Sequence, residues 1–152
     1  MTRNFHQGKF RPKYPEKYMG DPTNIVYRSS WELKAMNAFD LNPGILYWSS
    51  EECIVPYYWE LDGKMHRYFP DFIIIANSKN GPGKAMIEIK PYKETIPPVM
   101  KKGKRKKTMV EEVKTWSKNQ AKWAAAAEYC SKRDMDFIKM TEYDLFPNGK
   151  AW

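Results

Sequence analysis

The sequence has few cysteines and no long apolar segment, and each shortage excludes a class of protein. Cys53 and Cys130 are the only cysteines, they lie far apart, and they form no CxxC pair. That usage suits a reducing cytosol and makes a structural zinc site unfavourable. No apolar run reaches the roughly 18 residues that span a bilayer, and the N-terminus lacks the apolar core of a secretory signal. We therefore expect no membrane segment.

Several catalytic signatures are missing as well. His6 and His66 are the only histidines, and neither stands at a metal-ligand spacing. We find no Ser-His-Asp arrangement, no GxGxxG and no P-loop. For His66, a structural or surface role is the simpler interpretation. The chemistry must therefore be sought among the carboxylates and the lysines.

Basic residues, by contrast, are abundant. The chain has 152 residues with 42% hydrophobic residues, which is a globular composition and enough for one domain with a core. It holds 26 Lys and Arg against 18 Asp and Glu, a net charge of +8. This balance favours an anionic partner, with nucleic acid as the first candidate. The alternative is a basic protein that binds no polyanion.

The order of predicted elements indicates an α/β fold. Residues 1–24 are rich in Pro, Lys, Arg and Tyr without a helical or strand period. We interpret them as an extended arm on the domain or on a partner, with 25–152 as the domain. Ser29 and Glu32 form a capping-box pattern that starts a helix. The predicted elements are a helix at 29–41, strands at 45–50, 53–60, 64–69 (continuing through a kink at Pro70 into 71–76) and 84–90, a turn at 77–84, a loop at 91–107, a helix at 108–132, a strand at 136–140 and a short helix at 142–146.

Two of these strands carry carboxylates. Asp71 opens one apolar run, and Glu88 lies inside the next, two residues before Lys90. If the strands pair as a hairpin, the two acids come close, and at about 4 Å they repel by roughly 4 kcal/mol. A shared proton, an opposing lysine or a divalent cation could offset this, and an oxygen-rich site suits Mg²⁺. The alternative is an edge aspartate beside a Glu–Lys surface pair.

The spacing resembles the PD-(D/E)xK nuclease superfamily. Pro70-Asp71 is followed, after a gap of sixteen residues, by Glu88-Ile89-Lys90. The resemblance implies a restriction-endonuclease-like αβββαβ core with a mixed sheet flanked by helices. It further implies that Asp71, Glu88 and the Ile89 carbonyl bind Mg²⁺. Mn²⁺ can take the place of Mg²⁺ in such a site. Lys90 would position the attacking water and stabilise charge on the phosphate, giving hydrolysis of phosphodiester bonds.

Two helical residues extend the predicted site by the same resemblance. Glu32 would complete the metal site from the first helix, although it also fits as the capping partner of Ser29. Gln120 interrupts the apolar face that we predict for the second long helix, and it would reach the catalytic pocket. Its alternative role is a hydrogen bond at the seam between helix and sheet. That predicted face comprises Val113, Trp116, Gln120, Trp123 or Ala124, and Ala127.

A run of basic residues follows the Glu88 strand and predicts DNA contact. It would emerge near the site, where each neutralised phosphate steepens the salt dependence of binding. A solvated charged loop is the alternative. The predicted DNA-binding residues are Lys93, Lys101, Lys102, Lys104, Arg105, Lys106, Lys107 and Lys122.

Longer blocks resemble the head completion family of T-even-type tailed phages over about residues 10–146. They are Tyr27-Arg28-Ser29-Ser30-Trp31-Glu32, Tyr68-Phe69-Pro70-Asp71-Phe72, Glu88-Ile89-Lys90 and Asn119-Gln120-Ala121-Lys122-Trp123. The same segments resemble TnsA-type transposon endonucleases, whose last pair is Gln-x-Lys where this chain has Glu88-Ile89-Lys90.

This resemblance implies a role in finishing DNA-filled heads before tails attach. Expected partners are DNA and the portal, neck or other head completion proteins, and the expected location is the virion head or neck and the host cytoplasm. Two alternatives stay open. One is a non-enzymatic, DNA-binding head or neck protein built on a nuclease fold. The other is a junction-resolving or transposon-type endonuclease.

Overall fold

Four strands form the central sheet of the computed structural model, which describes residues 7–147. The strand order is β3-β6-β7-β8. The first two pairings are antiparallel, whereas β7 and β8 run parallel, so the chain must cross over between them. The strands are β3 (Ile45–Ser50), β6 (Phe72–Ser78), β7 (Gly81–Ile89) and β8 (Met135–Met140).

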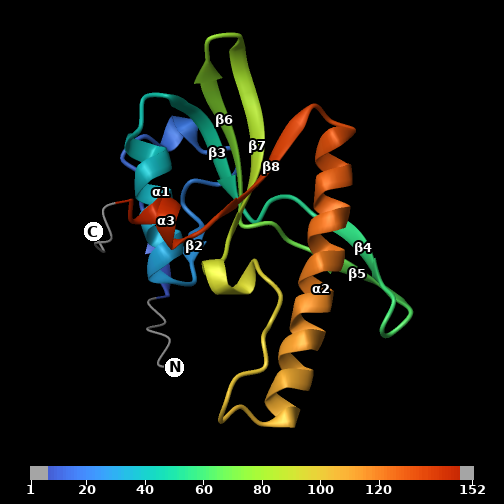
Figure 1. Ribbon diagram of the computed structural model, residues 1–152. Helices are drawn as coiled ribbons and strands as arrows, with labels where there is room; N and C mark the ends of the chain where they lie inside the picture. The colour runs from blue at the N-terminus through green and yellow to red at the C-terminus, as the bar shows by residue number, and fades with distance from the viewer. Residues whose placement is uncertain (1–6, 148–152) are drawn as a thin grey trace.

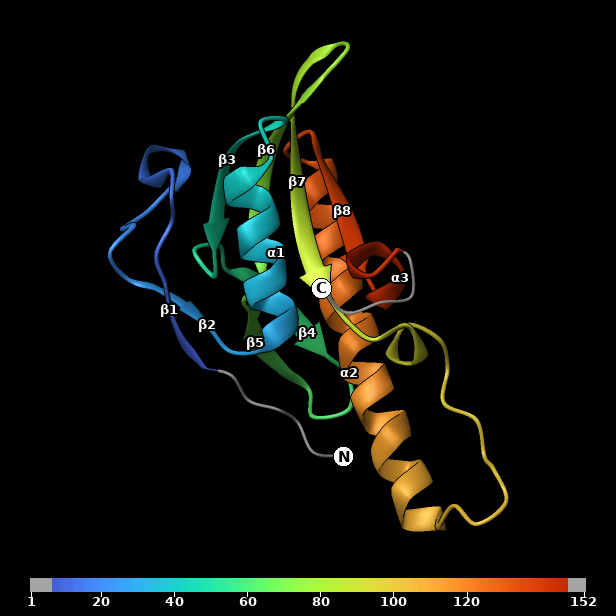
Figure 2. The same ribbon diagram turned by 90° about the vertical axis from the view of Figure 1, so that its left-hand side faces the viewer.

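Helices cover both faces of this sheet, α1 (Ser30–Leu41) on one and α2 (Lys106–Ser131) on the other (Figure 1, Figure 2). Side chains alternate along β6, so Phe72 and Ile74 join the core beneath α1 while Ile73 joins the core beneath α2. The short α3 (Glu142–Leu145) packs its Leu145 on the α1 side. The predicted α/β class, with a mixed sheet between helices, is confirmed.

A separate hairpin departs from the prediction. Strands β4 (Val55–Trp59) and β5 (Lys64–Tyr68) pair with each other and pack against α2. The predicted continuation of the 64–69 strand into 71–76 is wrong, because β5 and β6 belong to different sheets. The chain changes sheet at the buried Pro70, whose nitrogen cannot donate to a ladder.

The turn predicted at 77–84 is also wrong. Strands β6 and β7 continue pairing to Ser78 and Gly81, which leaves Lys79 and Asn80 as the connection. Gly81 has a φ of +98°, a conformation that a side chain would strain. Other boundaries move by one or two residues, since β4 begins at 55, α2 at 106 and β8 at 135.

The segment before α1 lies on the domain as far as it is described. Strand β1 (Gly8–Phe10) pairs with β2 (Ile25–Tyr27), and a 3-10 turn, η1, covers Pro15–Lys17. Phe10 and Tyr18 are buried, with ring centroids 5.7 and 4.8 Å from that of Trp48. Of the two predicted placements for this arm, on the domain or on a partner, residues 7–24 show the first. The division at residue 24 stays a prediction, and residues 1–6 lie outside the described residues.

This segment is fastened to the end of α1. The buried Asp40 accepts hydrogen bonds from the backbone N–H groups of Lys13 (2.7 Å) and Tyr14 (3.1 Å). The ammonium of Lys17 donates to the carbonyls of Phe39, Asp40 and Asn42 at 2.7, 2.8 and 3.0 Å. A cation at the C-terminal end of a helix also meets the negative end of the helix dipole.

The N-terminal half of α2 extends beyond the sheet, together with the loop that precedes it (Figure 1, Figure 2). The buried residues of α2 are Asn119, Trp123, Ala126 and Cys130, all in its second half. The predicted apolar face is wrong at Val113, Gln120 and Ala127, which are exposed, whereas its Trp123 is buried. Without a sheet opposite the first half, apolar spacing there does not mark a core. In the described part of the chain, no helix is long and apolar enough to cross a membrane.

Candidate active site

Asp71 and Glu88 come together at one end of the sheet, where β7 ends and β6 begins. Phe72 pairs with Ile87, so the residues before and after them, Asp71 and Glu88, lie next along the two strands. The Oδ2 atom of Asp71 accepts a hydrogen bond from the Ile89 N–H at 2.7 Å. The predicted juxtaposition of the two acids therefore follows from the register of one hairpin.

Glu88 is enclosed beneath α2. It is 6% exposed, and its Oε2 accepts a hydrogen bond from the hydroxyl of Tyr68, at the end of β5. The indole N–H of the buried Trp123 also lies near Glu88 and lowers its pKa. Among the described residues, this N–H makes no hydrogen bond of standard geometry. Glu88 thus meets neutral donors from two other elements.

Both carboxyl groups hold their protons far more tightly than exposed acids do. Burial raises the pKa of Asp71 to about 7, against the opposing effects of the Ile89 N–H and the charge of Lys90. Burial likewise raises the pKa of Glu88 to about 7, and Lys90 and Lys122 oppose that rise. The effect of burial on these two pKa values therefore exceeds the opposing effect of the neighbouring lysines.

Lys90 and Lys122 approach this pair from different elements. Lys90 follows β7 directly and is half-buried, and its backbone N–H donates to the Met140 carbonyl at 2.9 Å. Lys122 projects from α2 with its ammonium 5.8 Å from the centre of the Tyr68 ring. Burial lowers the pKa of Lys122, and the charge of Lys90 lowers it further. The structure thus brings Lys122 to the carboxylates as a second cation.

Glu32 fulfils the alternative role given above and also lies near the pair. Its backbone N–H donates to the Ser29 hydroxyl at 3.1 Å, and its Oε2 accepts from the Arg28 N–H at 2.7 Å. It therefore caps α1, one residue away from the usual capping-box pairing. Burial raises the pKa of Glu32, and its charge raises the pKa of both Asp71 and Glu88.

Glu51 is a neighbour that the sequence did not reveal. It follows β3 with a φ of 54°, unusual for a residue with a side chain, and its N–H donates to the Asp71 carbonyl at 3.2 Å. Its carboxylate pairs with Arg28 at 3.1 Å and raises the pKa of Asp71. Only the β3–β6 register places Glu51 here, and no motif announces it. Tyr68 is a second neighbour without a predicted role, because the contact of β5 with Glu88 depends on how the hairpin packs.

The donor set suits a hard cation held by two acids rather than three. Among the residues described, no group of three or more His, Cys, Asp or Glu side chains is arranged to hold a metal ion. Asp71 and Glu88 each use one oxygen on a neutral donor, and their other oxygens accept no hydrogen bond at standard geometry from residues 7–147. Two carboxylate oxygens with uncompensated charge fit Mg²⁺ or Mn²⁺. A metal role for Glu32 stays a prediction.

Gln120 is not gathered into this group. It is exposed on α2, whereas its neighbour Asn119 is 5% exposed and lines a groove of about 620 Å³ between α2 and the preceding loop. Asn119 rather than Gln120 faces inward because the buried face of α2 consists of Asn119, Trp123, Ala126 and Cys130. The groove also has an apolar part that includes Ile96, Val99 and Trp116.

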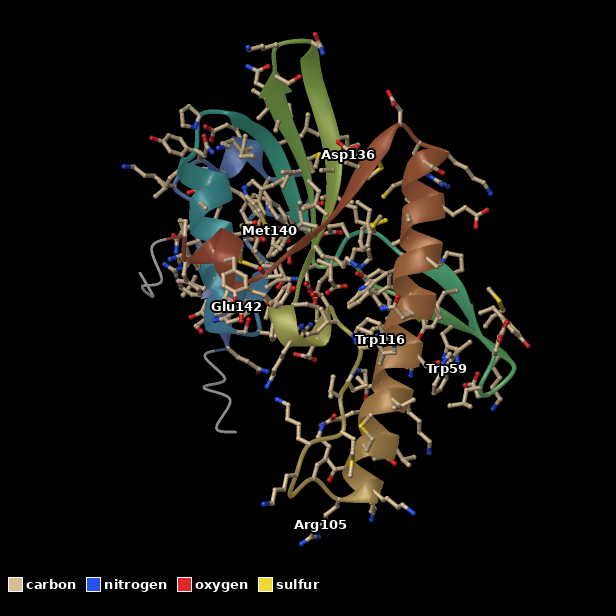
Figure 3. All side chains as sticks on the ribbon, viewed as in Figure 1. Trp59, Arg105, Trp116, Asp136, Met140 and Glu142 are labelled. Carbon is tan, nitrogen blue, oxygen red and sulfur yellow. The ribbon has the colours of Figure 1, made fainter. Side chains whose placement is uncertain are left out.

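The predicted DNA-binding residues divide into free and engaged ones. Lys104 donates to the Val99 carbonyl at 2.6 Å and to Glu112 at 2.7 Å, so it fastens the loop to α2. Arg105 stands at the tip of the extended half of α2 (Figure 3). The exposed members are Lys93, Lys101, Lys102, Arg105, Lys106 and Lys107.

Comparison with known proteins adds two findings. The N-terminal family of TnsA-like endonucleases matches residues 42–142, which include Asp71, Glu88, Lys90 and Lys122. The head completion nuclease of Enterobacteria phage T4 is 42% identical over 143 residues, which cover 92% of this chain and 93% of that protein. The first element of the site, Glu32 on α1, precedes the segment matched by the family.

Proposed function

This chain belongs to the TnsA-like endonuclease family, and we propose that it is a Mg²⁺-dependent endodeoxyribonuclease that acts on packaged DNA during phage head completion. The observation that carries the proposal is the buried pair of Asp71 and Glu88, with pKa values of about 7 and two lysines beside them. In a protein without a bound cation, burying two such acids side by side would only cost stability. In a site that binds a cation and a phosphate, the two acids have a function.

Each residue of the site has a role in this proposal. Asp71 and Glu88 would hold the ion through their unengaged oxygens, and when bound it would polarise the scissile phosphate and lower the pKa of the attacking water. Lys90, half-buried beside both acids, would orient that water and stabilise charge on the phosphate. Lys122 would add positive charge from α2, and Glu32 and Glu51 would keep the start of α1 and the end of β3 in place around Asp71.

The DNA would lie across the exposed basic residues at one end of the molecule. Lys101, Lys102, Lys106 and Lys107 crowd around the start of α2, where the helix dipole adds positive potential. The name of the phage T4 relative, head completion nuclease, supports a role in the phage head. The expected partners are therefore DNA and proteins of the portal or neck, with a location in the virion and the host cell.

The test is cleavage of linear, circular and branched DNA with Mg²⁺ or Mn²⁺. Wild type is compared with Asp71→Ala and Glu88→Ala after circular dichroism has shown that both variants are folded. We expect wild type to cut and both variants to lose at least about a hundredfold in rate, since each removes one of two ion-binding side chains. Glu128→Ala is the matched control, because it removes an exposed carboxylate of α2 that pairs with Lys132 at 3.0 Å, and it should cut like wild type.

A folded wild type that cuts none of these substrates with either ion contradicts the proposal. If it also binds DNA in a salt-sensitive way that survives both substitutions, the chain is a non-enzymatic DNA-binding head protein. Preference for branched DNA over linear ends would instead indicate a junction-resolving enzyme.

A further inference from the structure

Tyr68 joins the β4–β5 hairpin to the acidic pair. Its ring is 5% exposed and packs in the core between the hairpin, the sheet and α2. Its hydroxyl donates a hydrogen bond to Oε2 of Glu88. The hairpin stands outside the αβββαβ succession of α1, β3, β6, β7, α2 and β8. An inserted element therefore supplies a hydrogen-bond donor to a carboxylate of the core fold.

The hairpin that carries Tyr68 is itself fixed in place. The indole N–H of Trp59 donates to the Ser117 hydroxyl at 3.2 Å, and the ammonium of Lys118 lies 5.2 Å from the centre of the Trp59 ring. Val55 and Tyr57 are buried against the same face of α2. Figure 3 shows Trp59 beside the helix, on the hairpin side. Tyr68 is thus held from three directions, by its own strand pairing, by the sheet and by α2.

A fixed donor matters to Glu88 because a glutamate side chain has several rotatable bonds. Left alone, its carboxylate can present either oxygen, or neither, to a ligand. A hydroxyl in a set position removes most of that freedom by occupying one oxygen. Donors that orient a ligating carboxylate commonly matter about 10- to 100-fold for metal affinity or activity.

We propose that Tyr68 is a positioning residue of the nuclease site, whose hydroxyl holds Oε2 of Glu88 and thereby leaves Oε1 for a divalent cation. The inference rests on the metal-dependent function proposed above. It assigns the β4–β5 hairpin a part in the active site, in addition to its packing against α2. Tyr68 itself touches neither the DNA nor the ion in this arrangement.

The test uses Tyr68→Phe, with Tyr57→Phe as the matched control. Tyr57 is 3% exposed, lies on the same hairpin and stacks on His66, with ring centroids 5.2 Å apart. Each substitution removes one hydroxyl from a buried tyrosine and keeps the ring. Mn²⁺ binding to the full-length protein without DNA, measured by electron paramagnetic resonance, should weaken about tenfold or more in Tyr68→Phe and stay unchanged in Tyr57→Phe.

Cleavage separates positioning from loss of structure. The Mn²⁺ concentration for half-maximal cutting should rise in Tyr68→Phe by the same factor as the dissociation constant, with cutting restored at saturating Mn²⁺. A merely structural role lowers the folded fraction and leaves the Mn²⁺ midpoint unchanged. Equal Mn²⁺ affinity in folded Tyr68→Phe and wild type overturns the inference.

Failure of this inference differs from failure of the proposed function. If wild type binds Mn²⁺ and cuts while Tyr68→Phe matches it, the nuclease stands and the positioning role falls. If wild type neither binds Mn²⁺ nor cuts DNA, both the proposed function and the positioning role of Tyr68 are wrong. Should Tyr68→Phe not fold, 4-fluorophenylalanine at position 68 fills most of the volume of the hydroxyl and cannot donate a hydrogen bond to Glu88. A Mn²⁺ affinity equal to that of wild type would then overturn the inference.

Discussion

At the scale of single residues, Asp71 and Glu88 make the stability of the ion-free protein depend on pH. Both have folded-state pKa values near 7, well above the ordinary values of 3.8 and 4.5. The folded state therefore binds more protons than the unfolded state between about pH 4 and pH 7. Their contribution to stability is fully present below pH 4, declines as pH rises through this window, and is lost above about pH 7.

Neutralising Glu88 should consequently stabilise the ion-free protein at high pH. In EDTA at pH 8, we expect Glu88→Gln to raise the free energy of unfolding by on the order of 2 kcal/mol, because a buried charge is replaced by a neutral amide. At pH 4 the effect should nearly vanish, since Glu88 is protonated there. Urea unfolding at both pH values measures this. An equal effect at the two pH values would contradict the assigned protonation.

Added Mg²⁺ should likewise stabilise the wild type more at high pH than at low pH. The ion competes with protons for the same oxygens, so it should raise the melting temperature more at pH 8 than at pH 5. Asp71→Asn should remove most of this pH-dependent shift. Thermal scans with and without Mg²⁺ measure it, and a shift of the same size at pH 5 and pH 8 would place the ion elsewhere.

At the scale of elements, Lys17 links the segment before α1 to the end of that helix. Lys17→Met removes three charge-assisted hydrogen bonds to carbonyls and should lower the free energy of unfolding by about 1–3 kcal/mol. Lys13→Met is the control, because Lys13 reaches Asp40 only through its backbone N–H. Chemical denaturation of the two variants compares them. If both variants lose the same free energy of unfolding, the positive charge in this segment, rather than the contacts of Lys17 with the carbonyls, stabilises the fold.

The sequence predicts the elements of this fold better than their edges and faces. Local signals predict three parts of the structure. Capping by Ser29 predicts α1, the apolar runs predict the β6–β7 hairpin, and the ExK segment predicts the acidic pair. The switch between sheets at Pro70 and the inserted hairpin depend on pairing partners that no local pattern states. Similarly, the spacing of Val113 and Trp116 predicts an apolar face that includes Gln120, whereas the structure exposes Gln120 and has no sheet opposite the extended half of α2.

At the scale of the whole molecule, the exposed members of the predicted DNA-binding set collect around the start of α2 and the loop before it. Replacing Lys101, Lys102 and Lys107 by Gln should reduce the slope of log K against log salt by up to about 2.7 if each contacts one phosphate. Fluorescence anisotropy with duplex DNA over a range of salt concentrations measures this.

The matched control changes three lysines at the other end, Lys79, Lys84 and Lys132, which lie beside the β6–β7 turn, on the early part of β7 and after α2. It removes the same net charge and should change the slope far less. Equal slopes in the two variants would show that DNA responds to total charge and not to the basic end.

The parallel pairing of β7 with β8 also governs when the site exists during folding. The β6–β7 hairpin, which brings Asp71 to Glu88, joins residues close in sequence and can form early. Lys122 and Trp123 arrive only after the chain has closed the long crossover through α2 and docked β8, a non-local and therefore slower step. A chain still emerging from the ribosome, or one truncated before α2, carries the two acids without their cover. We therefore expect the site to be completed late in folding, after its two acids have come together.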